Sequence, residues 1–236
     1  MILVNNKPVD YFELINELIS QHYLKTPLLI EAFKNINRAD FLPDDLRDEA
    51  GFNAPLPIGY GQTNSQPLTV AFMLELLQPQ PGDRILDIGS GSGWTSALLA
   101  WCVSGGGEGR PPAPPAAERE AARENKVGKV YAIERIPELC EFGKQNIAKY
   151  NYIAKGVVKT ICADGTKGLA EEAPFDKIIA AASAGKIPAA WKEQLKIGGR
   201  LVLPVENSIW LLDKTGQNKF EEKEFPGFVF VPLIED

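Results

Sequence analysis

Residues 84–103 read RILDIGSGSGWTSALLAWCV, and this stretch decides the fold. The apolar run 84–88 predicts a buried strand, residues 89–93 a tight glycine turn, and residues 94–103 a helix. Glycines let a ligand come close to the backbone, and the first amides of a helix have no partner within the helix. A strand that enters a helix through glycines therefore predicts a ligand site at the turn.

The same alternation of strand and helix continues downstream. Pro137 is well placed in the first turn of a helix that extends to about Lys149. Six further segments read as strands: 129–134, 157–162, 175–182, 200–205, 208–213 and 228–233. This order predicts an α/β fold, a Rossmann-like sheet of about seven mostly parallel strands with helices on both faces. The segments 200–205 and 208–213 leave no room for a helix between them, and the last two strands are expected to add an antiparallel edge.

The segment before residue 84 has a different character. Apolar residues at helical spacing predict one helix after Asp10 and a second after Thr26, whereas residues 53–67 are rich in Pro, Gly, Asn and Gln and predict a long ordered loop. We expect a single domain over 1–236. Residues 1–80 would form a helical segment and a functional loop, 81–205 the ligand-binding core, and 206–236 the C-terminal strands.

Residues 104–126 form a low-complexity segment in which acidic and basic residues nearly balance. Its composition contains too few apolar residues to form a core. We interpret it as a solvated insertion that lengthens a connection between helix and strand. A lid or a docking tether is the alternative.

The composition excludes several classes of protein. The chain has 236 residues, a net charge of −6 and 44% hydrophobic residues, which is typical of a globular domain. Its three cysteines, Cys102, Cys140 and Cys162, form neither a disulfide framework nor a metal-ligand pattern, so we expect a cytoplasmic protein without a metal. No signal sequence and no run of about 18 apolar residues is found, so no membrane association is expected. The acidic charge disfavours nucleic acid as a partner, and without coiled-coil heptads a monomer is expected.

Two common nucleotide motifs do not match the glycine turn. The dinucleotide fingerprint G-x-G-x-x-G would place a glycine where the chain has Trp94, and no Lys-Ser or Lys-Thr follows as in a P-loop. The pattern G-x-G-x-G with an acid two residues earlier resembles the methyltransferases that use S-adenosylmethionine. The resemblance implies these cofactor-binding residues: Asp87, Gly89, Ser90, Gly91, Gly93, Glu134, Asp164 and Gly165.

The resemblance also implies a role for each acid. Glu134 would accept hydrogen bonds from the ribose hydroxyls, and Asp164 would bind the adenine amino group while the Gly165 amide serves a ring nitrogen. Asp87 would lie near the methionine end, where its charge favours a cation. The alternative is that these acids only cap turns.

A second motif, PIGYGQTNSQP at 57–67, makes the resemblance more specific. It is similar to the loop G-Q-T-I-S-Q-P of protein-L-isoaspartate O-methyltransferases of the bacterial type. The likeness extends over nearly the whole chain, through LDIGSGSG, VYAIER, ADG, FDKIIAAASAGKIPAAWKEQLKIGGRLVLPV and FVPL. The departures are Asn64 where the family has an apolar residue, Leu68-Thr69 where an aromatic or His then Met is common, and the insertion.

This resemblance implies methyl transfer from S-adenosylmethionine to the free carboxylate of isoaspartyl residues in damaged proteins, yielding an ester that collapses to a succinimide. Such a carboxylate is already ionised at neutral pH, so no general base is required, and we interpret the single histidine, His22, as structural. Ser65 would orient the substrate as the catalytic residue, or serve as a helix N-cap, or do both. Gln62 and Thr63 would bind substrate in the same opening. Residues 57–63 and 228–233 would form a groove for an extended peptide.

Three other functions remain open. A small-molecule methyltransferase would keep the cofactor residues but gives no reason for the loop at 57–67. A non-catalytic recognition module would keep the fold and use the insertion as a tether. A nicotinamide oxidoreductase is disfavoured by Trp94.

Overall fold

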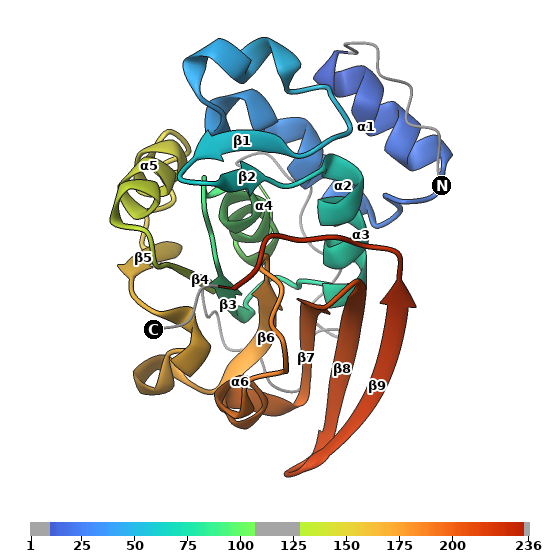
Figure 1. The fold of residues 1–236 in the computed structure, drawn as a ribbon, viewed down its shortest axis with the longest axis vertical. Coiled ribbons are helices and arrows are strands. Elements are labelled where there is room, and N and C mark those ends of the chain that lie inside the picture. Colours follow the sequence, from blue (N-terminus) through green and yellow to red (C-terminus); the bar gives the residue numbers. More distant parts are fainter. Residues whose placement is uncertain (1–9, 107–127, 234–236) are drawn as a thin grey trace, which may run out of the picture.

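The computed structural model describes residues 10–106 and 128–233, so most of the predicted insertion lies outside the described residues. Within them, one sheet contains seven strands in the order β5-β4-β3-β6-β7-β8-β9 (Figure 1). The strands are β3 (Arg84–Ile88), β4 (Lys129–Glu134), β5 (Val158–Cys162), β6 (Phe175–Ala180), β7 (Leu195–Val205), β8 (Ser208–Gly216) and β9 (Lys219–Pro226). The first five are parallel and the last two pair antiparallel. The predicted mostly parallel sheet with an antiparallel edge is confirmed.

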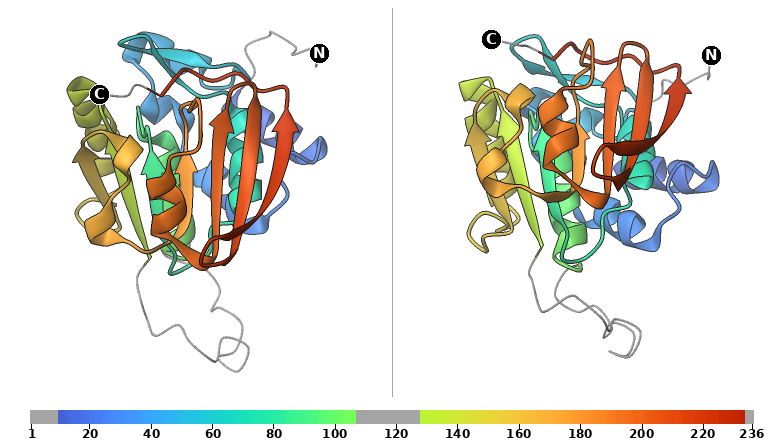
Figure 2. Two further views of the ribbon diagram at one scale, coloured as in Figure 1. Left: turned by 60° about the horizontal axis from the view of Figure 1, so that its bottom comes forward. Right: turned by 90° about the horizontal axis from the view of Figure 1, so that it is seen from below.

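Helices cover both faces of this sheet, which explains why its central strands are apolar on both sides. Successive side chains of a strand point to opposite faces, so Ile85 packs into one core while Leu86 and Ile88 pack into the other. The first core lies under α3 (Pro67–Leu77), α4 (Trp94–Val103) and α5 (Pro137–Ala148), and the second lies under α6 (Ala189–Gln194). Figure 2 shows α6 on one face of the sheet and α3 and α4 on the other.

The N-terminal segment is helical, as its apolar spacing predicted. It contains α1 (Tyr11–Ser20), α2 (Pro27–Asn35) and the 3₁₀ turns η1 (Arg38–Phe41) and η2 (Asp44–Glu49). The apolar stripes of α1 and α2 join the first core, and Phe33 packs edge-on against Trp94 at the start of α4. The segment therefore rests on the helix that follows the glycine turn.

The predicted loop at 53–67 contains an antiparallel hairpin that sequence reasoning missed. Strand β1 (Leu56–Gly59) pairs with β2 (Gln62–Asn64) across a turn at Tyr60 and Gly61, where the backbone is left-handed. We call the segment from Leu56 to Asn64 the substrate hairpin. Each strand is too short to show a convincing alternation of apolar and polar residues.

The predicted strand at 228–233 is wrong, and the seventh strand is β9. Gly227, with φ +99°, turns the chain out of the sheet, and among the described residues after it only an isolated bridge between Ser183 and Pro232 is found. The Ser183 amide donates to the Val231 carbonyl at 2.8 Å, and the Leu233 amide donates to the Ser183 carbonyl at 2.7 Å. Strand β9 was missed because it reads KFEEKEFP. An edge strand exposed to water carries such charges, and so lacks the apolar signal of a central strand.

Neither a membrane-spanning helix nor a cluster suited to a metal ion is found in the described residues. Over residues 10–106 and 128–233, the structure contains no helix with the length and apolar character needed to cross a bilayer. The same ranges hold no cluster of three or more His, Cys, Asp or Glu side chains suited to a metal ion. Within these ranges Cys102, Cys140 and Cys162 form no disulfide.

Candidate active site

A cleft opens at the carboxyl ends of β3, β4 and β6, where the strand order reverses direction. Ligands of open parallel sheets bind at this kind of switch point. The empty volume of the cleft is about 810 Å³, and its walls include Ile88 to Gly91, Ile133 to Ile136, and Ala181 with Ala182. The glycine turn therefore lies where the sequence predicted a ligand site.

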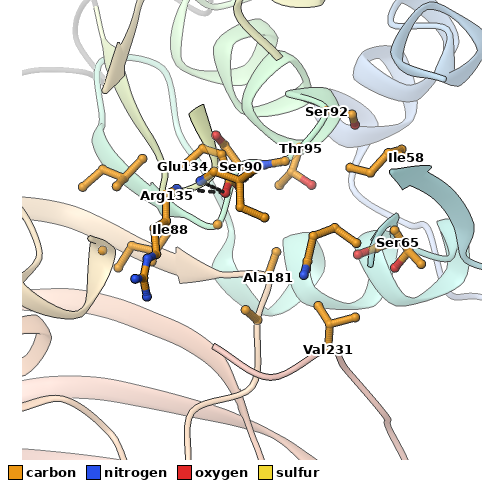
Figure 3. Close-up of a pocket in the computed structure, with 18 of the residues that line it drawn as sticks. Ile58, Ser65, Ile88, Ser90, Ser92, Thr95, Glu134, Arg135, Ala181 and Val231 are labelled. Carbon is orange, nitrogen blue, oxygen red and sulfur yellow. Dashed lines mark hydrogen bonds between the residues drawn. The ribbon is translucent and has the colours of Figure 1, made fainter. Parts of the chain in front are cut away.

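The Glu134 carboxylate fixes the glycine turn to the end of β4. Its Oε2 accepts the Gly91 amide at 2.8 Å, and its Oε1 accepts the amides of Arg135 and Ile136 at 2.8 and 3.0 Å. Figure 3 shows this carboxylate at the cleft beside Ser90. A carboxylate accepts about four hydrogen bonds, so these three leave about one for a ligand hydroxyl. The ribose role predicted for Glu134 stays a prediction.

Helix α5 packs against the glycine turn and forms a hydrogen bond with it, through residues that sequence reasoning did not select. A Cβ on Gly143 would lie 2.6 Å from the Gly91 carbonyl oxygen, and the Asn146 amide Nδ2 donates to the Ser92 carbonyl at 3.1 Å. A glycine inside a helix costs about 1 kcal/mol relative to alanine, so its presence in α5 was a signal of close packing.

Asp87 is completely buried and does not line the cleft. It points to the face covered by α4, where the Ser96 hydroxyl donates to its Oδ2 at 2.6 Å. Among the described residues its Oδ1 has no hydrogen-bond partner. Burial raises the pKa of Asp87 to about 7, against the opposing effect of the Ser96 hydrogen bond. This acid is therefore poised to change its charge near neutral pH.

We expect Asp87→Asn to stabilise the ligand-free protein at pH 8 but not at pH 4. In the unfolded chain Asp87 ionises above its ordinary pKa of 3.8, whereas in the folded chain it keeps its proton to about pH 7. The free energy of unfolding therefore falls between these two pH values and stays low above them. Asparagine resembles the protonated acid and escapes this loss, which is on the order of 4 kcal/mol. Urea denaturation of both proteins at pH 4, 6 and 8 measures the effect, and an equal difference at every pH would contradict it.

Asp164 caps a short turn beside the cleft. Its carboxylate accepts the amide and the hydroxyl of Thr166 at 2.9 and 2.7 Å, at the start of η4 (Gly165–Lys167). Its neighbours Ala163 and Gly165 line the cleft, while Asp164 does not. The Gly165 carbonyl accepts the Trp191 indole N–H at 2.9 Å. In this structure the Asp164 side chain therefore caps a turn, which was the alternative to its adenine-binding role.

A second cavity adjoins the cleft, and the two meet at Ser65. Four residues line both spaces: Thr63, Ser65, Ala181 and Val231. The second cavity is otherwise lined by Pro55, Gln66, Thr69, Val229 and Phe230. In Figure 3, Ser65 lies across the cleft from Glu134. A ligand in the cleft and a second ligand in the adjoining cavity would therefore meet at the half-buried Ser65.

The alternative role of Ser65 as a helix cap is wrong. Helix α3 begins at Pro67, and the preceding residue, Gln66, makes no capping bond through its side chain. The Ser65 hydroxyl is therefore available to the space between the two cavities.

Most of the predicted site residues come together at the cleft. Ser65, Gln62, Thr63, Gly89, Ser90, Gly91, Glu134 and Gly165 line it. Asp87, Gly93 and Asp164 lie next to lining residues without lining it themselves. Ile58 and Val231, which also line it, belong to the two segments expected to form the peptide groove. Among the lining residues that sequence reasoning missed are Ser92, Thr95, Arg135, Ile136, Ala181 and Ala182.

Comparison with known proteins agrees with this architecture. A family model described as protein-L-isoaspartate(D-aspartate) O-methyltransferase matches residues 10–236. A protein-L-isoaspartate O-methyltransferase of Methanopyrus kandleri is 39% identical over 225 residues, covering 94% of this chain and 89% of that protein. One of Aeropyrum pernix is 40% identical over 210 residues, covering 87% of this chain and 72% of that protein.

A solved structure shares the fold. It is the crystal structure of a protein-L-isoaspartate O-methyltransferase from Plasmodium falciparum in complex with S-adenosyl-L-homocysteine. It covers 97% of this chain and 100% of its own, with a TM-score of 0.79 and 21% sequence identity. Since the family model and the relatives extend over nearly the whole described chain, this chain belongs to the protein-L-isoaspartate(D-aspartate) O-methyltransferase family.

Proposed function

We propose that this chain transfers a methyl group from S-adenosylmethionine to the free carboxylate of isoaspartyl residues in damaged proteins and peptides. The observation that carries the proposal is the meeting of the cleft and the second cavity at Ser65, in a chain of this family. A two-substrate reaction needs two adjoining sites with a shared boundary. The residues at this boundary include two of the three that we predicted to act on the substrate, Ser65 and Thr63.

The cleft fits the cofactor. Gly89 and Gly91 line it with backbone and carry no side chain that would fill it. The turn would hold the methionine part, Glu134 the ribose, and the Gly165 region the adenine. When bound, S-adenosylmethionine supplies a methyl group attached to a positively charged sulfur.

The protein's own part in the reaction is to position the substrate. An α-carboxyl group has an ordinary pKa of about 3.3 to 3.7, so the substrate carboxylate is ionised at neutral pH. The chain needs no general base, and its single histidine, His22, is exposed and does not line the cleft. The Ser65 hydroxyl would donate its hydrogen to one carboxylate oxygen and leave the other free to attack. Correct orientation of two reactants supplies on the order of 7 to 11 kcal/mol.

The substrate hairpin and the segment from Phe228 to Leu233 would guide the damaged peptide. The hairpin contributes Thr63 to the second cavity, and the C-terminal segment contributes Val229, Phe230 and Val231. An enzyme that accepts many sequences around a damaged site must bind mainly the peptide backbone.

Tritium-methyl transfer tests the proposal directly. The protein is expected to label a synthetic isoaspartyl peptide and to leave the matched aspartyl peptide unlabelled. In the isoaspartyl linkage the chain continues through the side-chain carbonyl, so the α-carboxylate is free, whereas in the aspartyl peptide the α-carboxyl group is part of the backbone. Labelling of small acids with neither peptide labelled would favour a small-molecule methyltransferase. Binding of S-adenosylhomocysteine without labelling of any substrate would favour a recognition module.

We also propose a cytoplasmic monomer that acts without nucleic acid or membrane. The odd number and wide separation of the three cysteines and the net charge of −6 support this proposal. Size-exclusion chromatography with light scattering tests the monomer, since a dimer would elute at twice the mass.

A further inference from the structure

The side chain of Arg38, in η1, is completely buried and binds both ends of the substrate hairpin. On the side before β1, its Nη1 donates to the carbonyls of Ala50 and Phe52 at 3.3 and 2.7 Å, and its Nη2 to that of Ala54 at 2.8 Å. On the side after β2, the same Nη2 donates to the carbonyls of Asn64 and Ser65 at 3.3 and 3.1 Å. The Arg38 guanidinium group thus binds both the segment that precedes the hairpin and the segment that follows it.

Asn64 continues this set of contacts to the glycine turn. Its Oδ1 accepts the Arg38 Nε at 2.8 Å, and its Nδ2 donates to the Ser92 hydroxyl at 2.9 Å. Asn64 and Ser92 are 3% and 4% exposed, so water does not compete for these bonds. Ser92 lies between two glycines of the turn, and its carbonyl accepts the Asn146 amide of α5. The position at which this chain departs from the family motif is therefore the one that joins the hairpin to the cofactor turn.

The contacts of Arg38 fix the position of the substrate hairpin and contribute little to the free energy of unfolding. Burial lowers the pKa of Arg38 to about 9, so the group remains charged at pH 7. Every hydrogen-bond acceptor that the structure gives it is neutral. Burying a charge without a counter-charge costs several kcal/mol, which good hydrogen bonds only partly repay. Such a group defines one geometry, because any displacement of the hairpin leaves a buried donor unpaired.

We propose that Arg38, Asn64 and Ser92 form a positioning relay that holds Ser65 at the distance from the glycine turn that methyl transfer requires. The relay rests on the function proposed above and adds two positioning residues: Arg38, which lies outside the motif and the cleft, and Asn64, which lines the cleft and had no role there. Because the Ser65 carbonyl is itself an Arg38 acceptor, a shift of the relay moves the catalytic residue directly. A misplacement of about 1 Å in such a site costs on the order of 100-fold in rate.

The test is a double-mutant cycle with Asn64→Ala, Ser92→Ala and the double variant. At saturating cofactor and isoaspartyl peptide, we expect Asn64→Ala to lower kcat by 10- to 100-fold and to change the KM for S-adenosylmethionine by less than threefold. The double variant should be no slower than the slower single variant, because the second change removes a bond already lost. Losses that multiply, or an Asn64→Ala kcat within threefold of the parent, would overturn the relay.

Two further variants separate positioning from folding. Asn64→Asp should retain kcat within about threefold, because a carboxylate accepts from the Arg38 Nε and the Ser92 hydroxyl rotates to donate. Asn218→Ala, at the exposed turn between β8 and β9, should leave kcat unchanged. A loss in Asn64→Asp as large as in Asn64→Ala would contradict the proposed bonding. Arg38→Lys cannot reproduce the planar fork and is expected to lower stability, so the Asn64 variants carry the test.

Amide hydrogen exchange tests the relay without any substrate. In the ligand-free protein, Asn64→Ala should accelerate amide hydrogen exchange in β1 and β2 by about 10-fold and leave β3 unchanged. Unchanged exchange in the hairpin would overturn the relay even if activity fell. A parent protein that fails to label the isoaspartyl peptide refutes the proposed function. A parent that labels it, with Asn64→Ala equally active, refutes the relay alone.

Discussion

Replacing Ser65 by alanine is expected to lower kcat on an isoaspartyl peptide by about 100-fold while changing the affinity for S-adenosylhomocysteine by less than threefold. The change removes one hydroxyl at the boundary shared by the cleft and the second cavity. The substrate carboxylate then loses the donor that orients it, so fewer bound complexes have an oxygen in line with the methyl group. The backbone contact between the Ser65 carbonyl and Arg38 remains, so the hairpin keeps its place.

Steady-state methylation at saturating substrates measures kcat, and calorimetry with S-adenosylhomocysteine measures the affinity for the cofactor product. Ser20→Ala is a matched control, because that serine lies at the exposed end of α1, where its hydroxyl donates to the Glu17 carbonyl at 2.9 Å. Equal losses of kcat and cofactor affinity in Ser65→Ala would make Ser65 a residue of the fold and not of the reaction. A kcat within threefold of the parent would remove it from the mechanism.

The cofactor end of the molecule could be predicted because its signals are local. The strand, glycine turn and helix at 84–103 are consecutive in sequence, and each has a distinct pattern of apolar residues or glycines. The substrate end could not be predicted to the same extent. Its hairpin is too short for periodicity to be visible, and β9 carries charges because it lies at an edge.

The residues that support the site were hidden for a different reason. Arg38 precedes the hairpin by many residues, and nothing in its neighbours indicates that its guanidinium is buried among carbonyls. Asn64 was noticed only as a departure from a motif, and its partners, Arg38 and Ser92, are distant in sequence. Buried polar contacts between distant segments depend on how the folded elements meet, which a single sequence does not report.

Gly93→Ala is expected to weaken binding of S-adenosylhomocysteine by more than 100-fold and to lower the free energy of unfolding by about 2 to 5 kcal/mol. Gly93 has φ +85°, a conformation that costs a residue with a Cβ about 1 to 2 kcal/mol. A Cβ there would also lie 2.8 Å from the Ile147 Cγ1 and 2.9 Å from the Gly143 carbonyl oxygen. Overpacking of this kind adds about 1 to 3 kcal/mol.

The turn can relieve these contacts only by moving away from α5, and that movement breaks the bonds that shape the cleft. The Gly91 amide would leave Glu134, and the Ser92 carbonyl would leave Asn146. Cofactor affinity should therefore fall more steeply than stability alone requires.

Gly105→Ala is the matched control, because Gly105 has nearly the same φ, +84°, while a Cβ at that position would meet no atom of the described residues within 4 Å. Its loss therefore measures the backbone strain without the steric clash. It should lose about 1 to 2 kcal/mol in urea denaturation and keep the parent's affinity for S-adenosylhomocysteine. If Gly93→Ala also keeps that affinity while its stability falls, the turn shapes the fold without contacting the cofactor. The cofactor would then be held by Glu134 and the Gly165 region without the glycine turn. Its binding site would in that case lie at the ends of β4 and β5.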